Sequence, residues 1–244
     1  MKRLIHSLLR SRGYDIIRAN KAEPSALAEI RKIFNGCPPT ILFDVGANEG
    51  QTAIGFSSAF PQAIIHSFEP FHDAFLQLQK LASRQPRIRP VKLALGDKIG
   101  SHEFCLNTTS VTNSLLPAEP EARSMIDPRS TTEVQVSTID EYCRETGIHS
   151  VDILKIDTQG YDLKVLQGSE RLIAANQVAV VFAEVLFVPL YVGQAYFHHI
   201  YEHLAGRGFW LVGLYDVEVN VRKYASWANA LFVSPEGLRK MQRA

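Results

Sequence analysis

The chain has 244 residues, of which 46% are hydrophobic and 21% are charged, and its formal net charge is +1. These values are typical of one globular domain with a sizeable core, and they give no indication of nucleic-acid binding. The three cysteines, Cys37, Cys105 and Cys143, are scattered along the chain, which fits a reducing compartment and no metal site. No run is apolar and long enough to span a membrane, so we expect a cytoplasmic protein.

Residues 1–36 are predicted to form one or two amphipathic helices, with a break near Gly13, that pack on the domain formed by residues 37–244. The apolar part of the first ten residues is too short and interrupted for a signal peptide, so any membrane contact is expected to be peripheral. The second helix is predicted over Ala26 to Phe34, followed by two prolines that lead into the first strand. The sequence does not decide whether the protein forms a homo-oligomer.

The stretch from Thr40 to Thr52 predicts a buried strand, a tight turn and the start of a helix, which is the first unit of a parallel sheet. The turn has the spacing D-x-G-x-x-x-G, and we expect free backbone N–H groups there that suit a nucleotide-like ligand. The carboxylates of Asp44 and Glu49 would repel a pyrophosphate but attract an ammonium or a sulfonium group. The charges therefore favour S-adenosylmethionine (SAM) over NAD. The alternative is an N-terminal cap whose acids suit the helix dipole, and both can hold at the same time.

The second strand, residues 63–68, ends at Glu69 and Pro70. An acid at this strand tip can accept hydrogen bonds from both ribose hydroxyls of an adenosine, although a helix cap is the alternative. The third strand, residues 88–95, is followed by Gly96 and Asp97. We expect this turn to lie against the adenine, with a plain turn role for Asp97 as the alternative.

Residues 98–136 interrupt the alternation of strands and helices and contain two short predicted strands, at 104–106 and 134–136. The segment between them is rich in Ser, Thr, Asn and Pro and includes Ser114, a candidate substrate contact. A long polar excursion on the ligand-bearing side is usually a lid or substrate loop, and disorder is the competing interpretation.

The second half of the chain continues the alternation of helices and strands. The helices are predicted at 138–146, 160–175 and 193–205, and the strands at 151–157, 178–184, 209–215 and 228–233. The last two strands are joined by a short hairpin, which makes the final strand antiparallel. Strands one, two, four and five each end in an acid, namely Asp44, Glu69, Asp157 and Glu184.

Open parallel sheets bind ligands at the carboxyl ends of their strands, so we expect Asp157 to face the reacting centre. Asp157 is the first candidate for a general base and Glu184 the second, and either can instead orient hydroxyl groups of a substrate. His199 and His203 share a helix face but have no third metal ligand, so a solvated or packed face is favoured. Tyr191 and His198 are candidate substrate contacts.

Three motifs together carry a family resemblance: Asp44-Val45-Gly46-Ala47-Asn48-Glu49-Gly50, Phe68-Glu69-Pro70, and Leu154-Lys155-Ile156-Asp157-Thr158-Gln159-Gly160 followed by Glu184. Over about residues 40–234 the chain resembles the FkbM family of SAM-dependent methyltransferases. The resemblance implies a class I methyltransferase fold, an α/β Rossmann-like architecture with a seven-stranded, mostly parallel sheet, an antiparallel last strand and helices on both faces. It also implies O-methylation, often of a sugar in polysaccharides, glycolipids or natural products.

On this interpretation the SAM contacts come from the strand tips and the turns that follow them. They are Asp44, Gly46, Ala47, Asn48, Gly50, Gln51, Thr52, Glu69, Pro70, Gly96, Asp97 and Asp157. The acceptor, a glycan or a small molecule, is expected to contact Ser114, Gln159, Glu184, Tyr191 and His198.

Two residues depart from common patterns. Asn48 replaces a glycine of the usual class I turn, but Asn tolerates a left-handed backbone and is usual in the family. Gln159 replaces the Glu of the family's Asp-x-Glu-Gly pattern, so a base or ion-ligand role of that Glu would pass to Asp157, Glu184 or a histidine. Two other functions remain as alternatives, an NAD(P)-dependent oxidoreductase and a non-catalytic adenosine-binding scaffold.

Overall fold

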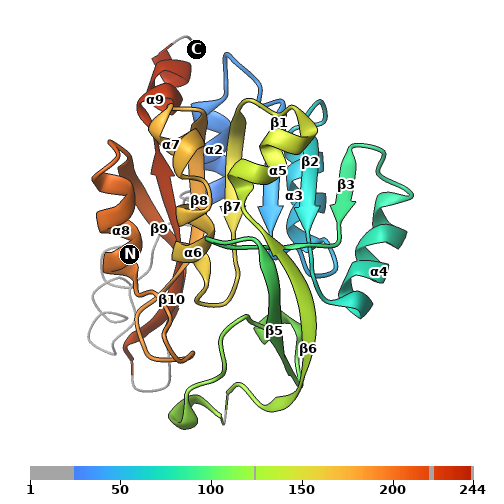
Figure 1. Ribbon diagram of the computed structural model, residues 1–244. Coiled ribbons are helices and arrows are strands. Elements are labelled where there is room, and N and C mark those ends of the chain that lie inside the picture. Colours follow the sequence, from blue (N-terminus) through green and yellow to red (C-terminus); the bar gives the residue numbers. More distant parts are fainter. Residues whose placement is uncertain (1–24, 124, 220–222, 243–244) are drawn as a thin grey trace, which may run out of the picture.

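The computed structural model describes residues 25–123, 125–219 and 223–242, and within them a central sheet has the strand order β3-β2-β1-β7-β8-β10-β9 (Figure 1). Its strands are β1 (Ile41–Val45), β2 (Ile64–Phe68), β3 (Ile88–Val91), β7 (Val151–Ile156), β8 (Val178–Leu186), β9 (Trp210–Val219) and β10 (Ala225–Val233). In this sheet β3, β2, β1, β7 and β8 are parallel to one another. Strand β10 is antiparallel to both of its neighbours, β8 and β9. The predicted class I methyltransferase sheet is confirmed.

Helices cover both faces of the sheet (Figure 1). One core contains Leu42 and Ile153 of the sheet and is covered by α2 (Ala26–Ile33), α3 (Gln51–Ala59), α4 (His72–Ala82) and α9 (Pro235–Gln242). The opposite core contains Phe43 and Leu154 and is covered by α5 (Ile139–Thr146), α6 (Asp162–Gln167), α7 (Glu170–Ala174) and α8 (Phe197–Ala205). Because both faces are covered, every residue of β7 is buried.

Several predicted boundaries differ from the structure. The predicted helix over 160–175 is two helices, which are separated at Gly168 and Ser169. Gly168 packs so closely on Gly96 that an added Cβ would lie 1.9 Å from the carbonyl oxygen of Gly96. The predicted helix over 193–205 begins only at Phe197, after Gly193 with a φ of 76°. The third strand stops at Val91, and Ala94–Leu95 forms a separate strand, β4, in a second sheet. Helix α9 has no counterpart among the elements predicted from the sequence.

The second sheet has the order β4-β6-β5 and contains the predicted extra strands (Figure 1). Strands β5 (Gly100–Asn107) and β6 (Pro128–Ser137) form an antiparallel hairpin that projects from the carboxyl end of the main sheet. We call residues 108–127, between these strands, the hairpin loop; it includes the short 3-10 helices η1 (Ser110–Thr112) and η2 (Pro120–Ala122). Two backbone hydrogen bonds of 2.8 Å hold this loop against the segment before α8. The N–H of Glu119 donates to the carbonyl oxygen of Leu190, and the N–H of Val192 donates to the carbonyl oxygen of Pro117.

At the amino-terminal end, helix α2 confirms the second predicted helix, and Ser25 caps it by accepting a hydrogen bond from the N–H of Ala28. Its residues Ile30 and Ile33 are buried in the core beneath the sheet. The first predicted helix and the break near Gly13 lie outside the described residues. Among the helices described, none combines the length and apolarity needed to cross a bilayer.

Candidate active site

A pocket of about 340 Å³ lies at the carboxyl ends of β1, β2 and β7, a size that suits a cofactor or small ligand. Three groups of residues form its wall. The main sheet contributes the turn after β1, the end of β2 and the end of β7; the connection before β5 contributes Leu93, Ala94 and Leu95; and the hairpin contributes Phe104, Ser110, Val111, Asn113 and Leu115. The ligand-binding edge predicted from the strand-tip motifs is therefore partly covered by the inserted hairpin.

The turn after β1 contributes Gly46, Ala47, Asn48, Gln51 and Thr52 to the pocket wall. Its backbone is left-handed at Gly46, with a φ of 75°, and at Asn48, with a φ of 46°. The N–H groups of Gly46 and Ala47 both donate to the carbonyl oxygen of Phe68, and that of Asn48 donates to Glu69. These N–H groups, which we expected to be free for a ligand, instead attach the turn to β2.

Glu69 lies in the pocket wall and is 6% exposed. Its carboxylate accepts hydrogen bonds of 2.8 Å from the N–H groups of Asn48 and Phe71. Burial raises the pKa of Glu69 to about 7, even though these two hydrogen bonds act in the opposite direction. Each carboxylate oxygen can accept a second bond, so the group remains suitable for ribose hydroxyls.

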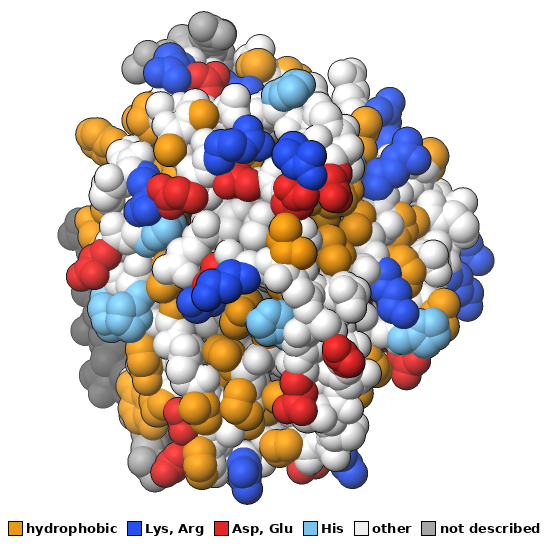
Figure 2. Space-filling model, in the orientation of Figure 1, with side chains coloured by type: hydrophobic (Ala, Val, Ile, Leu, Met, Phe, Trp, Pro, Cys, Tyr) orange, Lys and Arg blue, Asp and Glu red, His pale blue; other side chains and the backbone are white. Residues whose placement is uncertain are grey.

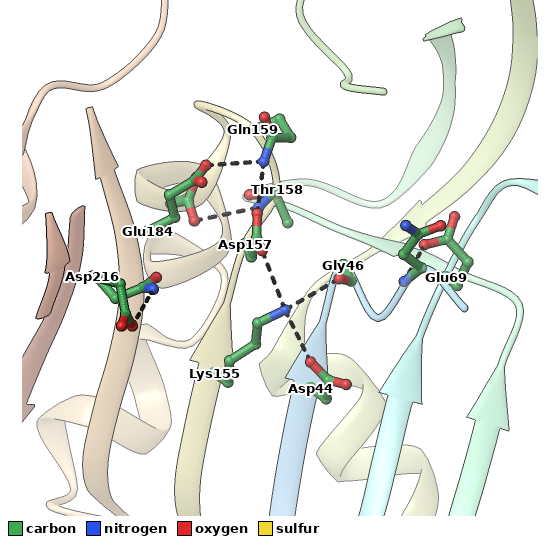
Figure 3. Close-up of polar contacts among 12 residues, drawn as sticks. Asp44, Gly46, Glu69, Lys155, Asp157, Thr158, Gln159, Glu184 and Asp216 are labelled. Carbon is green, nitrogen blue, oxygen red and sulfur yellow. Dashed lines mark hydrogen bonds and ion pairs between the residues drawn. The ribbon is translucent and has the colours of Figure 1, made fainter. Parts of the chain in front are cut away.

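Asp44 is fully buried and does not line the pocket. The ammonium of Lys155 lies 3.0 Å from Asp44 Oδ1, 3.2 Å from the carbonyl oxygen of Gly46 and 3.6 Å from Asp157 Oδ2 (Figure 3). Burial disfavours the charged ammonium, but the carboxylates of Asp44 and Asp157 outweigh it and raise the pKa of Lys155. This pairing changes the expected role of Asp44, because its charge acts on Lys155 beneath the turn.

Near the carboxyl ends of β7 and β8, the side chain of Gln159 joins Asp157 to Glu184; β8 continues to Leu186, two residues beyond its predicted end (Figure 3). Its Nε2 donates to Asp157 Oδ1 at 2.8 Å and to Glu184 Oε2 at 3.0 Å. Its Oε1 lies 2.8 Å from the hydroxyl of Tyr191, which is also 3.0 Å from the carbonyl oxygen of Thr112 in the hairpin loop. Asp157 and Gln159 line the pocket, whereas Glu184 and Tyr191 lie behind it.

The remaining predicted site residues are placed as follows. Ser114 is buried, and its hydroxyl donates to the carbonyl oxygen of Gln159 at 2.8 Å. Asp97 pairs with Lys164 at 2.9 Å; neither it nor the turn glycines Gly50 and Gly96 line the pocket.

Farther from the pocket, His198 is exposed on α8 and does not line the cavity. Its neighbour His199 uses Nδ1 to accept the N–H of Tyr196. In the part of the chain that is described, no group of three or more His, Cys, Asp or Glu side chains is arranged to hold a metal ion.

The sequence analysis missed the apolar part of the wall, chiefly Leu95, Phe104 and Leu115, and the ammonium of Lys155. The lysine has a detectable signal, since it is a charged residue inside a strand that is otherwise apolar. The hairpin residues have no comparable signal, because only folding brings them over the turn after β1. Ser110, for example, donates to Asn48 across this space at 3.2 Å.

The Methyltransferase FkbM domain family model matches residues 44–211, which include all four strand-tip acids. The chain belongs to the FkbM methyltransferase family. It is 24% identical over 166 residues to the 2-O-methyltransferase NoeI of Sinorhizobium fredii (strain NBRC 101917 / NGR234), covering 64% of this chain and 68% of that protein. The predicted family and enzyme class are confirmed, and the nicotinamide-dependent alternative is not retained.

Solved methyltransferases resemble the chain at low sequence identity and at TM-scores below 0.5. Magnesium protoporphyrin IX methyltransferase (ChlM) of Synechocystis PCC 6803, with bound SAM, has a TM-score of 0.47 and 11% identity, covering 96% of each chain. Precorrin-6y C5,15-methyltransferase of Geobacter metallireducens GS-15 has a TM-score of 0.44 and 9% identity, covering 91% of this chain and 95% of that chain.

The FkbM methyltransferase uses SAM as its methyl donor, and the pocket has groups that fit it. Glu69 can accept hydrogen bonds from ribose hydroxyls, and Leu95 and Phe104 provide apolar surface for an adenine. Asp157 supplies negative charge near the turn after β1, which suits an ammonium or sulfonium group. The bound donor supplies an electrophilic methyl group.

Proposed function

We propose that this FkbM methyltransferase transfers a methyl group from SAM to a hydroxyl group of a sugar, in a glycan or in a glycosylated natural product. The observation that carries the proposal is the carboxylate of Asp157, which lines the pocket beside the turn after β1. The relative named a 2-O-methyltransferase supports oxygen as the acceptor atom. The sugar class comes from the family resemblance of the sequence motifs.

A sugar hydroxyl is a poor nucleophile while it keeps its proton, so a base within about 3 Å assists the transfer. Asp157 suits this role because its side chain is 36% exposed and reaches the pocket. As the acceptor oxygen forms the new C–O bond, the C–S bond of the donor breaks with its electron pair going to sulfur. The hydroxyl proton passes to the Asp157 carboxylate.

The hairpin supports this chemistry by limiting the access of water. Positive charge on the donor is lost as the methyl group moves, so a pocket of low polarity favours the transfer. Phe104 and Leu115 form an apolar wall opposite the turn after β1, and Ser110 bonds to Asn48 across the opening. Figure 2 shows hydrophobic side chains gathered at the end of the molecule where the hairpin loop lies, and Val111 and Met125 of that loop are exposed. This surface suits the apolar face of a sugar ring or an aglycone.

The proposal is tested by incubating the protein with SAM carrying a labelled methyl group and a panel of acceptors. The panel contains free sugars, oligosaccharides, glycolipids and glycosylated natural products, together with matched compounds whose hydroxyls are replaced by hydrogen or already methylated. We expect label on one hydroxyl position of a carbohydrate and none on the matched compound. Label that appears only on nitrogen, or only on acceptors without a sugar, would overturn the proposal.

A further inference from the structure

The side-chain amide of Gln159 lies between two carboxylates (Figure 3). Its nitrogen donates to Asp157 at 2.8 Å and to Glu184 at 3.0 Å. An amide nitrogen carries two protons, so one is available for each carboxylate. The strand-tip acids of β7 and β8 are therefore held together by an uncharged donor.

Three features determine which way this amide faces. Gln159 has a φ of 55°, a left-handed conformation that costs free energy in a residue other than glycine and is concentrated at functional sites. Ser114 holds the backbone of Gln159 by donating to its carbonyl oxygen. The Tyr191 hydroxyl, 2.8 Å from Gln159 Oε1, is a donor for the amide oxygen. The reversed amide would direct its oxygen at the Asp157 carboxylate, which would repel it.

The surroundings of the two carboxylates are different. Asp157 lines the pocket and has the ammonium of Lys155 at 3.6 Å, a cation that is shared with Asp44. Glu184 lies behind the pocket wall; burial and the negative charge of Asp157 raise its pKa well above the usual range. Asp162 adds a further carboxylate behind the turn, fully buried, with burial raising its own pKa to about 7. Of these three acids, Asp157 is the one that lines the pocket and pairs with Lys155.

We infer that Gln159 and Tyr191 are positioning residues that hold the Asp157 carboxylate directed at the acceptor hydroxyl, while Glu184 holds the amide from behind. The inference rests on the proposed function, because it assumes an acceptor that must lose a proton. A neutral donor favours the charged form of the carboxylate it binds. A carboxylate at position 159, as in the family's Asp-x-Glu-Gly pattern, would instead add a like charge to the three acids already present.

The test compares the pH dependence of kcat/KM in four variants. Q159L removes both amide protons at similar size, and Q159E replaces them with a carboxylate. We expect the acidic limb of the profile to move to higher pH by about one unit in Q159L and by more in Q159E. Y191F removes the donor to the amide oxygen, together with the contact between this hydroxyl and the carbonyl oxygen of Thr112, and is expected to shift the limb in the same direction by less. Q79E makes the same chemical change on the exposed face of α4 and is expected to leave the profile unchanged.

A binding measurement separates positioning from damage to the fold. The Kd for S-adenosylhomocysteine, the spent donor, is expected to stay within about threefold of the wild type in Q159L and Y191F, since neither change removes a residue needed for the adenosine. Superimposable pH profiles for the wild type, Q159L and Y191F would overturn the inference. So would a uniform loss of kcat/KM at every pH with no shift of the limb.

If the proposed function is wrong, the wild-type protein will methylate no carbohydrate hydroxyl in the acceptor panel. That result differs from every outcome of the variant comparison. A carbon-13 titration of the Glu184 carboxyl needs no acceptor and tests the network directly. We expect Glu184 to titrate well above a free glutamate, and at still higher pH in Q159L, because a donor to its charged form is lost. An unchanged Glu184 titration in Q159L would contradict the role assigned to the amide.

Discussion

Gly46 lies so close to Asp157 that a Cβ added to Gly46 would be 1.9 Å from the carbonyl oxygen of Asp157. Real Cβ atoms do not approach a backbone oxygen to this distance, and the φ of 75° at Gly46 also disfavours a side chain. The turn that forms one wall of the pocket is therefore in direct contact with the end of the strand that carries the candidate base.

Replacing Gly46 with alanine should separate these two segments. We expect G46A to weaken S-adenosylhomocysteine binding by more than about tenfold and to lower the free energy of unfolding. The backbone must shift to relieve both the clash of the new Cβ with the Asp157 carbonyl oxygen and the strain of the left-handed conformation. Calorimetric titration and chemical denaturation measure the two effects. Gly55 is the matched control, since no atom lies within 4 Å of its added Cβ and G55A lies inside helix α3. G55A should be neutral or stabilising by up to about 1 kcal/mol. Wild-type affinity in G46A would contradict this account of the turn.

Replacing Lys155 with methionine should destabilise the fold. The Lys155 side chain is 7% exposed and Asp44 is fully buried, so K155M leaves a buried charge without its cation. We expect a loss of about 3–5 kcal/mol in the free energy of unfolding, measured by urea denaturation. The double variant K155M/D44N should recover part of that loss. K164M, which breaks the exposed pair with Asp97, should cost less than about 1 kcal/mol. Equal losses for K155M and K164M would show that burial is not the cause.

Affinity for S-adenosylhomocysteine should depend on pH through Glu69. Its pKa is raised to about 7 by burial, and the ionised carboxylate is the better acceptor for ribose hydroxyls. We therefore expect affinity to fall as the pH drops below about 7, with a much flatter profile in E69Q. Isothermal titration between pH 5.5 and 8.5 measures this dependence. A wild-type profile as flat as that of E69Q would rule out Glu69 as the titrating group.

The stability of the ligand-free protein should show the opposite slope. Between pH 4.5, the ordinary pKa of a glutamate, and about pH 7, Glu69 keeps a proton in the folded state that the unfolded chain has released. The folded state thus binds more protons, so the contribution of Glu69 to the free energy of unfolding decreases as pH rises through this window. Comparing the wild type with E69Q by denaturation at pH 5 and pH 8 isolates this term. An identical pH slope in both proteins would contradict the assignment.

Replacing Asp157 with asparagine should affect catalysis far more than binding of the spent donor. D157N keeps the size of the side chain but cannot accept a proton, so we expect kcat to fall by about 10²–10⁴-fold. The Kd for S-adenosylhomocysteine should rise far less than kcat falls, because the amide keeps its hydrogen bonding and loses only the charge that faces the ammonium group. D73N, on the exposed face of α4, is the matched control and should keep wild-type turnover. A D157N protein with normal kcat but lost cofactor binding would reverse the role assigned to this residue.

The sequence by itself determined the sheet, the turn after β1 and the family, because these depend on local patterns. Apolar strands that end in acids, and glycines at a fixed spacing, are features of short segments that can be identified before any packing is known. Only the tertiary structure decided how the charges are used. Asp44 was expected to face the donor, yet Lys155, which is 111 residues away along the chain, binds its carboxylate beneath the turn. Gln159 looked like a lost carboxylate, yet it joins Asp157 to Glu184 and is held by Ser114 and Tyr191. These roles depend on contacts between distant segments, and no local pattern of residues encodes such contacts.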